Sequence, residues 1–346
     1  MAVMTVTGPI EGHELGPTLH HEHVFIDTSA DYRDPPPSIA ELMGQMGVDL
    51  EAPITLQSLG FLRREPQWSV RNQILDDYDD AVEELGWARR AGVRSLIDTT
   101  PIMAGRRPAD LRRASQAVGM HIVTGTGYYR EAFQPPGVAD LTVTELEQRF
   151  LTEVTVGIEG TDVRAGVIGE LGTSGDTIRP VEERVLIAAA RVQHATNVPV
   201  MVHTEGRRHV VLAAIATLTA NGADPRRIHI CHVNGATWWR DVVETGATIG
   251  HDCFGSTFSI DSETKMNPTD AERIDDVRRV FDAGFGRSVL ISNDICMKMR
   301  LHRYGGWGYD HIQTNLLPFM RQAGFTEADL QVLFVENPRR LVDTAR

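Results

Sequence analysis

Hydrophobic and polar positions divide this chain into two alternating kinds of segment. Short runs rich in branched aliphatic residues recur, and each ends in polar residues before a stretch with helical periodicity. The expected strands are residues 18–24, 95–99, 121–126, 165–170, 199–203, 228–232, 247–250 and 288–294. Helical patterns, such as 76–91, 180–195 and 270–283, lie between them. Strands that alternate with helices are typical of parallel sheets, so the pattern predicts an α/β protein.

Eight such strands favour a closed (β/α)8 TIM barrel, with residues 1–346 as a single domain. An open doubly wound sheet is the alternative, but no G-x-G-x-x-G turn follows any of the strands. We expect residues 1–15 to form an N-terminal hairpin that caps the bottom of the barrel. Residues 27–69 include three consecutive prolines and predict an elaborated loop after the first strand, which would overhang the barrel mouth.

Composition and charge narrow the class of protein. Of the 346 residues, 42% are apolar and 23% are charged, as in globular proteins with a sizeable core. The net charge of −13 argues against nucleic acid as a partner, because nothing would neutralise its phosphates. No basic segment with a long apolar stretch opens the chain, so we expect a cytoplasmic protein without a membrane partner. Its three cysteines are widely spaced and predict no disulfide framework.

Metal-ligating residue types stand at the ends of the expected strands. In the first strand, His21 and His23 project from the same face, about 7 Å apart. Later strand ends supply two carboxylates and two more histidines: Glu170, His203, His232 and Asp294. The C-terminal strand ends of a barrel meet at one mouth, where four imidazoles and two carboxylates could bind two divalent metal ions. The alternative is that each is a lone buried polar residue with a local hydrogen bond.

Several short motifs occur in an order that one known family shares. They are Thr18-Leu-His-His-Glu-His, Gly166-Val-Ile-Gly-Glu-Leu-Gly-Thr-Ser, His203 after Val-Met-Val, Ile230-Cys-His232, Ser292-Asn-Asp294 and Glu336-Asn-Pro338. Through them nearly the whole chain resembles the phosphotriesterase family of the amidohydrolase superfamily. Residues 166–174 and 127–133 resemble most closely the phosphotriesterase homology protein branch, which has a bridging Glu where other members have a carboxylated Lys.

The resemblance implies a binuclear metal-dependent hydrolase. The family's ligand set would fall on His21, His23, Glu170, His203, His232 and Asp294. The first two histidines and the aspartate would hold a more buried ion, the other two histidines a more exposed ion, and the glutamate would bridge them. The ions are expected to be Zn²⁺, although Mn²⁺ or Co²⁺ suits the same ligands. A hydroxide shared by the ions would attack the substrate, and Asp294 would be the catalytic residue that carries its proton to the leaving group.

Two positions depart from the organophosphate-degrading members of this family. Cys253 and Gly235 stand where those enzymes have a His and an Asp that assist proton removal, so we expect that relay to be absent. We therefore expect hydrolysis of a lactone, carboxylic ester or amide. Phosphotriester hydrolysis and a non-catalytic, metal-dependent ligand-binding barrel are the alternatives. A homodimer is expected from the resemblance alone.

Basic residues follow several of the expected strands, although the protein is acidic overall. They are Arg106, Arg107, Arg130, Arg207, Arg208, Lys298, Arg300 and Arg303. They predict a small-molecule substrate with an anionic group or, alternatively, solvated loop charges that have carboxylate neighbours. Arg130 and Lys298 are the favoured substrate contacts. Tyr129 is expected beside the exposed metal or else as a packed rim residue, and His20 is expected to point away from His21 towards the helices.

Overall fold

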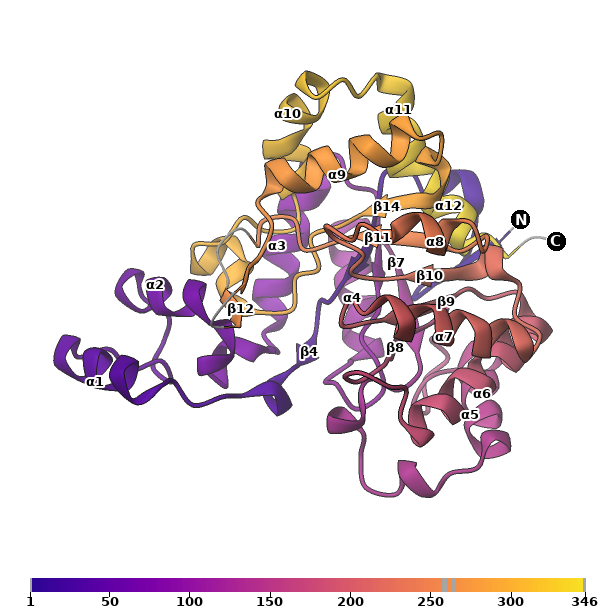
Figure 1. Cartoon of the computed structure of the whole chain (residues 1–346), viewed down its shortest axis with the longest axis horizontal. Coiled ribbons are helices and arrows are strands. Elements are labelled where there is room, and N and C mark those ends of the chain that lie inside the picture. Colours follow the sequence, from indigo (N-terminus) through magenta and orange to yellow (C-terminus); the bar gives the residue numbers. More distant parts are fainter. Residues whose placement is uncertain (1, 257–259, 263–264, 345–346) are drawn as a thin grey trace.

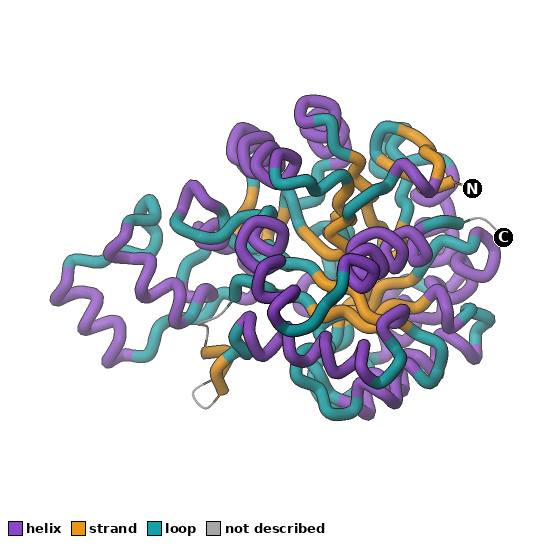
Figure 2. The backbone as a smooth tube through the Cα atoms, turned by 90° about the horizontal axis from the view of Figure 1, so that it is seen from above, coloured by secondary structure: helices purple, strands orange, loops and turns teal. Residues whose placement is uncertain are grey.

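The computed structural model describes residues 2–256, 260–262 and 265–344. An eight-stranded parallel sheet curls into a barrel with helices around it (Figure 1, Figure 2). In order around the sheet the strands are β3 (Thr18–Glu22), β6 (Ser95–Asp98), β7 (His121–Thr126), β8 (Val167–Gly172), β9 (Val200–His203), β10 (Ile228–Ile230), β11 (Thr248–His251) and β14 (Val289–Ile291). The predicted (β/α)8 TIM barrel is therefore confirmed.

The barrel closes between β14 and β3 through a side chain, since the described residues form no strand ladder there. Glu22 Oε1 accepts hydrogen bonds from Ser292 Oγ at 2.7 Å and from the Asn293 amide at 2.8 Å. Its Oε2 accepts the amide of Ile295 at 2.8 Å. A fully buried carboxylate, together with one backbone hydrogen bond from the Asp294 amide to the His21 carbonyl at 3.2 Å, thus holds the end of β14 against the first barrel strand.

Side chains on alternate positions of the strands pack on opposite faces of the barrel wall. Inward-facing apolar residues form an interior cluster: Ile97, Val123, Val167, Met201 and Leu290. The antiparallel hairpin of β1 (Ala2–Thr5) and β2 (Gly8–Glu11) adds Val3 to this cluster, and Leu15 follows it. The hairpin predicted within residues 1–15 therefore plugs the barrel from below, and its residues close the interior away from the mouth.

Helices cover the outside of the barrel (Figure 2). They are α3 (Tyr78–Arg90), α4 (Pro108–Val118), α5 (Val143–Thr155), α6 (Pro180–Thr196), α7 (Arg208–Ala220), α8 (Trp239–Val243), α9 (Asp270–Asp282), α10 (Leu317–Gln322), α11 (Glu327–Gln331) and α12 (Asn337–Val342). Capping boxes that begin at Thr142 and Thr269 start α5 and α9. Within the described ranges, none of the helices combines the length and apolar character that a membrane crossing requires.

The segment after β3 differs from the loop that the sequence predicts for residues 27–69. It contains α1 (Pro37–Met46) and α2 (Leu56–Arg64), which project from the barrel on the left of Figure 1. Pro37 occupies the first turn of α1, where a missing backbone N–H leaves no bond unmade. A small core of Met43, Leu50, Leu62 and Trp68 holds the two helices together. The antiparallel strand pair β4 (Ile26–Asp27) and β5 (Ile74–Leu75) joins the two ends of this segment to each other.

Candidate metal centre

Glu170 at the end of β8 is the meeting point of three histidines from other strands. Its Oε1 lies 3.0 Å from His203 Nδ1, 3.0 Å from His232 Nε2 and 3.4 Å from His21 Nε2. The glutamate is only 2% exposed. One carboxylate oxygen therefore stands within reach of imidazoles from both expected halves of the centre.

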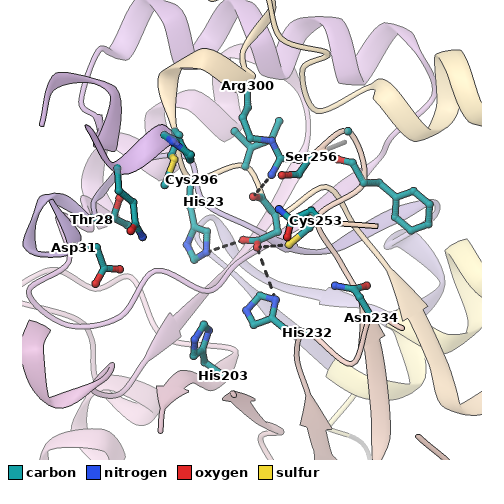
Figure 3. A pocket seen from close by; sticks show the side chains of 18 of the residues that line it. His23, Thr28, Asp31, His203, His232, Asn234, Cys253, Ser256, Cys296 and Arg300 are labelled. Atoms are coloured by element: carbon teal, nitrogen blue, oxygen red, sulfur yellow. Dashed lines mark hydrogen bonds and ion pairs between the residues drawn. The ribbon is translucent and has the colours of Figure 1, made fainter. Parts of the chain in front are cut away.

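Asp294, just after β14, forms a second meeting point. Its Oδ1 lies 3.4 Å from His23 Nε2 and 3.7 Å from His21 Nε2, and its Oδ2 lies 3.8 Å from His232 Nδ1. In Figure 3, dashed lines run from the labelled His23 and His232 towards a common point between them. Zinc bonds of about 2.0–2.2 Å hold neighbouring ligand atoms roughly 3–4 Å apart, so these separations fit shared ions. His21 Nε2 is buried and has no hydrogen-bond partner among the described residues, as expected of a nitrogen reserved for a metal. The donor set therefore fits two divalent ions.

Asp252, which follows β11, orients one ligand from each half of the centre. Its Oδ2 lies 2.9 Å from His21 Nδ1 and 3.1 Å from His232 Nδ1, and it also accepts the His232 amide at 3.0 Å. On the other side of the site, His23 Nδ1 pairs with Thr100 Oγ1 at 3.0 Å. Such outer contacts fix each ring so that its second nitrogen points towards the ion. Asp252 was not predicted as a site residue, and its only signal in the sequence is its place beyond a strand end.

Three residues of the site turn out of their strands in a left-handed backbone conformation. The φ angles are 60° at His232, 61° at Cys253 and 55° at Asp294. This conformation is uncommon for residues other than glycine and occurs often at functional sites. It also explains why β10 and β14 end before the predicted strand ends, since a left-handed residue cannot continue an extended strand. The turn directs the three side chains into the mouth.

The site carries concentrated negative charge that favours cations. Burial by itself raises the pKa of Glu170, but the imidazoles of His21 and His203 outweigh burial and hold that pKa well below its usual range. Asp294 shows the same balance, with its pKa lowered chiefly by His21 and by the hydrogen bond from His23. Both carboxylates are therefore ionised at neutral pH and available as metal ligands.

Tyr129 and Cys253 each contact a different one of the expected ligands. The Tyr129 hydroxyl lies 3.0 Å from His203 Nδ1, and burial raises its pKa well above the usual range, so it remains a hydrogen-bond donor. Cys253 Sγ donates to Asp294 Oδ2 at 3.2 Å (Figure 3). Gly235 offers no side chain to extend this contact. A thiol therefore adjoins the expected proton acceptor.

These residues lie at the floor of a cavity of about 1200 Å³. Of the basic residues expected at the mouth, three line the cavity: Arg130, Arg207 and Arg300. Lys298 does not line it, and its Nζ lies 3.2 Å from Asp76 Oδ1. The other four lie outside its wall: Arg106, Arg107, Arg208 and Arg303. The expectation that all eight face the mouth is corrected, because five are turned away by their own contacts.

Three further arginines line the cavity and were missed by the sequence analysis: Arg33, Arg63 and Arg273. None was among the basic residues expected at the mouth, because two lie within the long segment after β3 and one lies in α9. The expected position of His20 also needs correction. Its ring lies 4.8 Å from that of His229, and its Nε2 is 3.8 Å from Asp252 Oδ1. An irregularity in the pairing of β3 interrupts the alternation of faces, so His20 lies behind the metal centre.

Comparison with known proteins identifies the family. Residues 1–342 match the model of the Phosphotriesterase family. The chain belongs to the phosphotriesterase family. It is 31% identical over 346 residues to N-acetyltaurine hydrolase from Danio rerio, across 98% of this chain and 97% of that protein. The resemblance on which the sequence analysis relied is therefore confirmed, and the chain is a hydrolase of this family.

Two solved structures show how closely the barrel follows the phosphotriesterase family. A resiniferatoxin-binding protein from Rhodobacter sphaeroides is 34% identical with a TM-score of 0.93, covering 99% of this chain and 94% of that one. The phosphotriesterase homology protein from Escherichia coli, with phosphate in its active site, is 30% identical with a TM-score of 0.77. That likeness covers 95% of this chain and 99% of the other. The fold is thus shared over nearly the whole length.

Proposed function

We propose that this protein is a binuclear metal-dependent hydrolase that cleaves an amide with an anionic group. Lactones and carboxylic esters are the neighbouring substrate classes. The observation that carries this proposal is the convergence of His21, His203 and His232 on one oxygen of Glu170, beside Asp294, at the floor of a large cavity. The name of the Danio rerio relative, N-acetyltaurine hydrolase, supports an amide in first place.

Six residues would hold the two ions: His21, His23, Glu170, His203, His232 and Asp294. When bound, the ions would polarise the carbonyl group and lower the pKa of a water molecule. We propose zinc first, and manganese or cobalt is compatible with the same imidazole and carboxylate ligands.

The side chains around the ions would orient the substrate and move one proton. Asp294 would accept the proton of the attacking water and return it to the leaving nitrogen, because an amine leaves only when protonated. No side chain at Gly235 offers an onward route for that proton, which favours an amine over an aryl alcohol as the leaving group. Tyr129 would donate a hydrogen bond to the carbonyl oxygen as negative charge develops there.

Arg130 and Lys298 are the substrate contacts proposed from the sequence, and their surroundings differ. Arg130 lines the cavity between Asp31 and Glu205, with its ring neighbours Tyr129 and Phe133 beneath the guanidinium. It would bind a polar part of the substrate near the amide. Lys298 would have to leave Asp76 to reach the cavity, so we rank it second.

Metal content and turnover test the proposed function together. Wild-type protein should retain two transition-metal ions per chain, and Glu170→Ala and Asp294→Asn should retain fewer. The zinc-loaded wild type should hydrolyse N-acetyltaurine faster than a γ-lactone or an aryl phosphotriester. An absence of bound metal after reconstitution would refute the hydrolase mechanism. Faster cleavage of the phosphotriester would select that alternative.

One comparison favours a second candidate function. The Rhodobacter sphaeroides relative is named as a binding protein, so a metal-dependent ligand-binding barrel without turnover is the second candidate. Tight metal binding with no hydrolysis of any substrate class above would support it. We further propose a single domain over residues 1–346, a cytoplasmic location and a homodimer, and analytical ultracentrifugation would test the last.

A further inference from the structure

A buried arginine in the cavity wall has fewer partners than its charge requires. Arg273, in the first turn of α9, is 1% exposed and yet lines the cavity. Its Nη1 donates to the Pro268 carbonyl and lies 3.4 Å from Asp270 Oδ1, and its Nη2 lies 3.4 Å from the Ser256 carbonyl. Its Nε has no hydrogen-bond partner in the described parts of the chain. The guanidinium therefore retains unused donors.

Arg106 shows how the same fold treats a buried arginine with a structural role. Its Nη atoms contact Glu153 at 2.8 and 2.9 Å, and its Nε and Nη2 reach Glu159 at 3.1 and 2.9 Å. Burial lowers the pKa of both arginines, but the two glutamates more than offset burial at Arg106. The pKa of Arg273 remains lowered, because Cys253 and Asp270 offset burial only in part.

The carboxylate beside Arg273 is also shared with other groups. Asp270 Oδ2 lies 2.8 Å from His311 Nε2, and its Oδ1 accepts the Gly255 amide at 2.8 Å. A buried charge is stable only when it is paired and hydrogen-bonded. Arg273 therefore has the capacity to bind a further anion from the cavity.

Other polar groups face the same part of the cavity. Asn234 Oδ1 is buried and has no hydrogen-bond partner among the residues described. Figure 3 shows Asn234 and Ser256 on the Cys253 side of the site, away from Asp31. At Gly235, which also lines the cavity, a side-chain carbon would make only ordinary van der Waals contacts, the nearest at 3.8 Å to Asp276 Oδ2. The amide of Asn234 can present its NH2 group after a flip, because its two ends are interchangeable in shape.

We propose that Arg273, together with Asn234, binds the anionic group of the substrate, a carboxylate or sulfonate. This inference rests on the proposed function and adds where the anion lies, on the β10–β11 side of the centre. The planar guanidinium suits two oxygens of such a group at once. Arg130 is less suited to this role, because Asp31 and Glu205 already compensate its charge. Arg273 is thus the specificity-determining residue for charge.

Paired substrates of similar shape test the role of charge. N-acetyltaurine carries a sulfonate, whereas N-acetylpropylamine is neutral. Arg273→Gln should lower kcat/KM for N-acetyltaurine by about 30-fold or more, mainly through KM, and change that of the neutral amide by less than threefold. Arg273→Lys should keep part of the preference. Arg207→Gln is the matched control, because Arg207 lines the cavity but is 47% exposed and paired with Asp176. Equal losses on both amides would overturn the proposal.

A binding experiment separates this proposal from the hydrolase itself. Propanesulfonate is not hydrolysed, and its affinity for the metal-loaded protein can be measured by calorimetry. Wild type and Arg207→Gln should bind it, and Arg273→Gln should not. Asn234→Asp, which adds a negative charge to the cavity wall and leaves Arg273 intact, should also abolish binding, so the test survives poor folding of the arginine variant. Binding that depends on Arg273 would support the anion site even without amide turnover. No binding by wild type would overturn it even if amides are cleaved.

Discussion

At the scale of single residues, Asp252 supports both halves of the proposed metal centre. One oxygen faces His21 Nδ1 and His232 Nδ1, so Asp252→Asn would leave at least one ring without an acceptor. We expect metal affinity to fall about 10–100-fold, because outer hydrogen bonds orient metal-ligating rings. Competition with a fluorescent chelator would measure this change. Asp241→Asn is the control, since Asp241 pairs with the exposed Arg208. Equal affinity of Asp252→Asn and wild type would refute this role.

The sequence predicts a site residue when its position along a strand determines where its side chain lies, and fails when tertiary packing determines it. The six proposed ligands stand at or just beyond strand ends, and a parallel barrel brings all such ends together. Asp252 has the same position in sequence, but only the left-handed turn at Cys253 and the placement of His21 show that it lies behind the ligands. Arg273 lies on a helix, where charge predicts solvent exposure. Its burial follows from tertiary packing that no periodicity reveals.

At the scale of elements, Glu22 closes the seam between β3 and the end of β14. Glu22→Ala would leave buried donors of Ser292, Asn293 and Ile295 without their acceptor. Since each unsatisfied buried donor costs about 1–3 kcal/mol, we expect the free energy of unfolding to fall by at least about 3 kcal/mol. Urea unfolding at constant m would measure it. Glu83→Ala, on the exposed face of α3, should change it by less than about 0.5 kcal/mol. A decrease in the free energy of unfolding of less than about 1 kcal/mol would contradict the role of Glu22 in closing the barrel.

The end of β8 packs closely against the segment after β7, and this contact places Tyr129 and Arg130 at the mouth. A side-chain carbon at Gly172, the last residue of β8, would overlap the backbone nitrogen of Arg130. Gly172→Ala should therefore displace Tyr129 from His203, lowering kcat about tenfold or more while metal content is unchanged, because misplacement of catalytic groups by about 1 Å can cost 10²-fold. Kinetics with elemental analysis would show this. Gly44→Ala, which meets nothing within 4 Å, is the control. Unchanged kcat would show that the segment adapts.

Helices with a strong hydrophobic periodicity are predicted from this sequence, whereas helices that begin among prolines are mistaken for loop. The helices expected at 76–91, 180–195 and 270–283 match α3, α6 and α9 to within two residues. The helices α1 and α2 were read as loop, because the three prolines that precede and begin α1 are also loop signals. Their place beside the mouth depends on the small core that they share with Trp68.

At the scale of the whole molecule, the barrel follows from the alternation of strands and helices, but the shape of its cavity does not. The walls come from the excursion after β3 and from the loops after β7, β9, β10, β11 and β14, which meet only in the folded chain. Loop charges could therefore be recognised in the sequence without showing which of them face inward. Arg106 and Lys298 illustrate the point, since both are held by carboxylates away from the cavity.

Three buried histidines of the barrel strands, in β3, β10 and β11, link the stability of the whole molecule to pH. Burial is the main cause that lowers the pKa of His20 and of His251 to about 4, and that of His229 well below its usual value. In the unfolded chain these groups titrate near pH 6.5, so a falling pH protonates the unfolded state first. The contribution of these three groups to stability is therefore fully present above about pH 6.5 and declines as the pH falls below it; for His20 and His251 the decline levels off near pH 4, where the folded state takes up protons. Above pH 6.5 the metal-free protein responds instead to His21 and His232, because the groups around them outweigh burial and raise their pKa well above the usual value.

The slope of that fall is the quantity to measure. Each histidine contributes at most about 1.4 kcal/mol per pH unit, so urea unfolding of the metal-free protein between about pH 6.5 and 4.5 should show a slope of up to about three such contributions. His251→Leu should reduce the slope by one contribution, whereas His13→Gln, at an exposed position, should leave it unchanged. Chelator is present throughout, so that loss of metal does not add to the slope. Stability that stays constant across this window would mean that the three imidazoles are charged in the folded barrel.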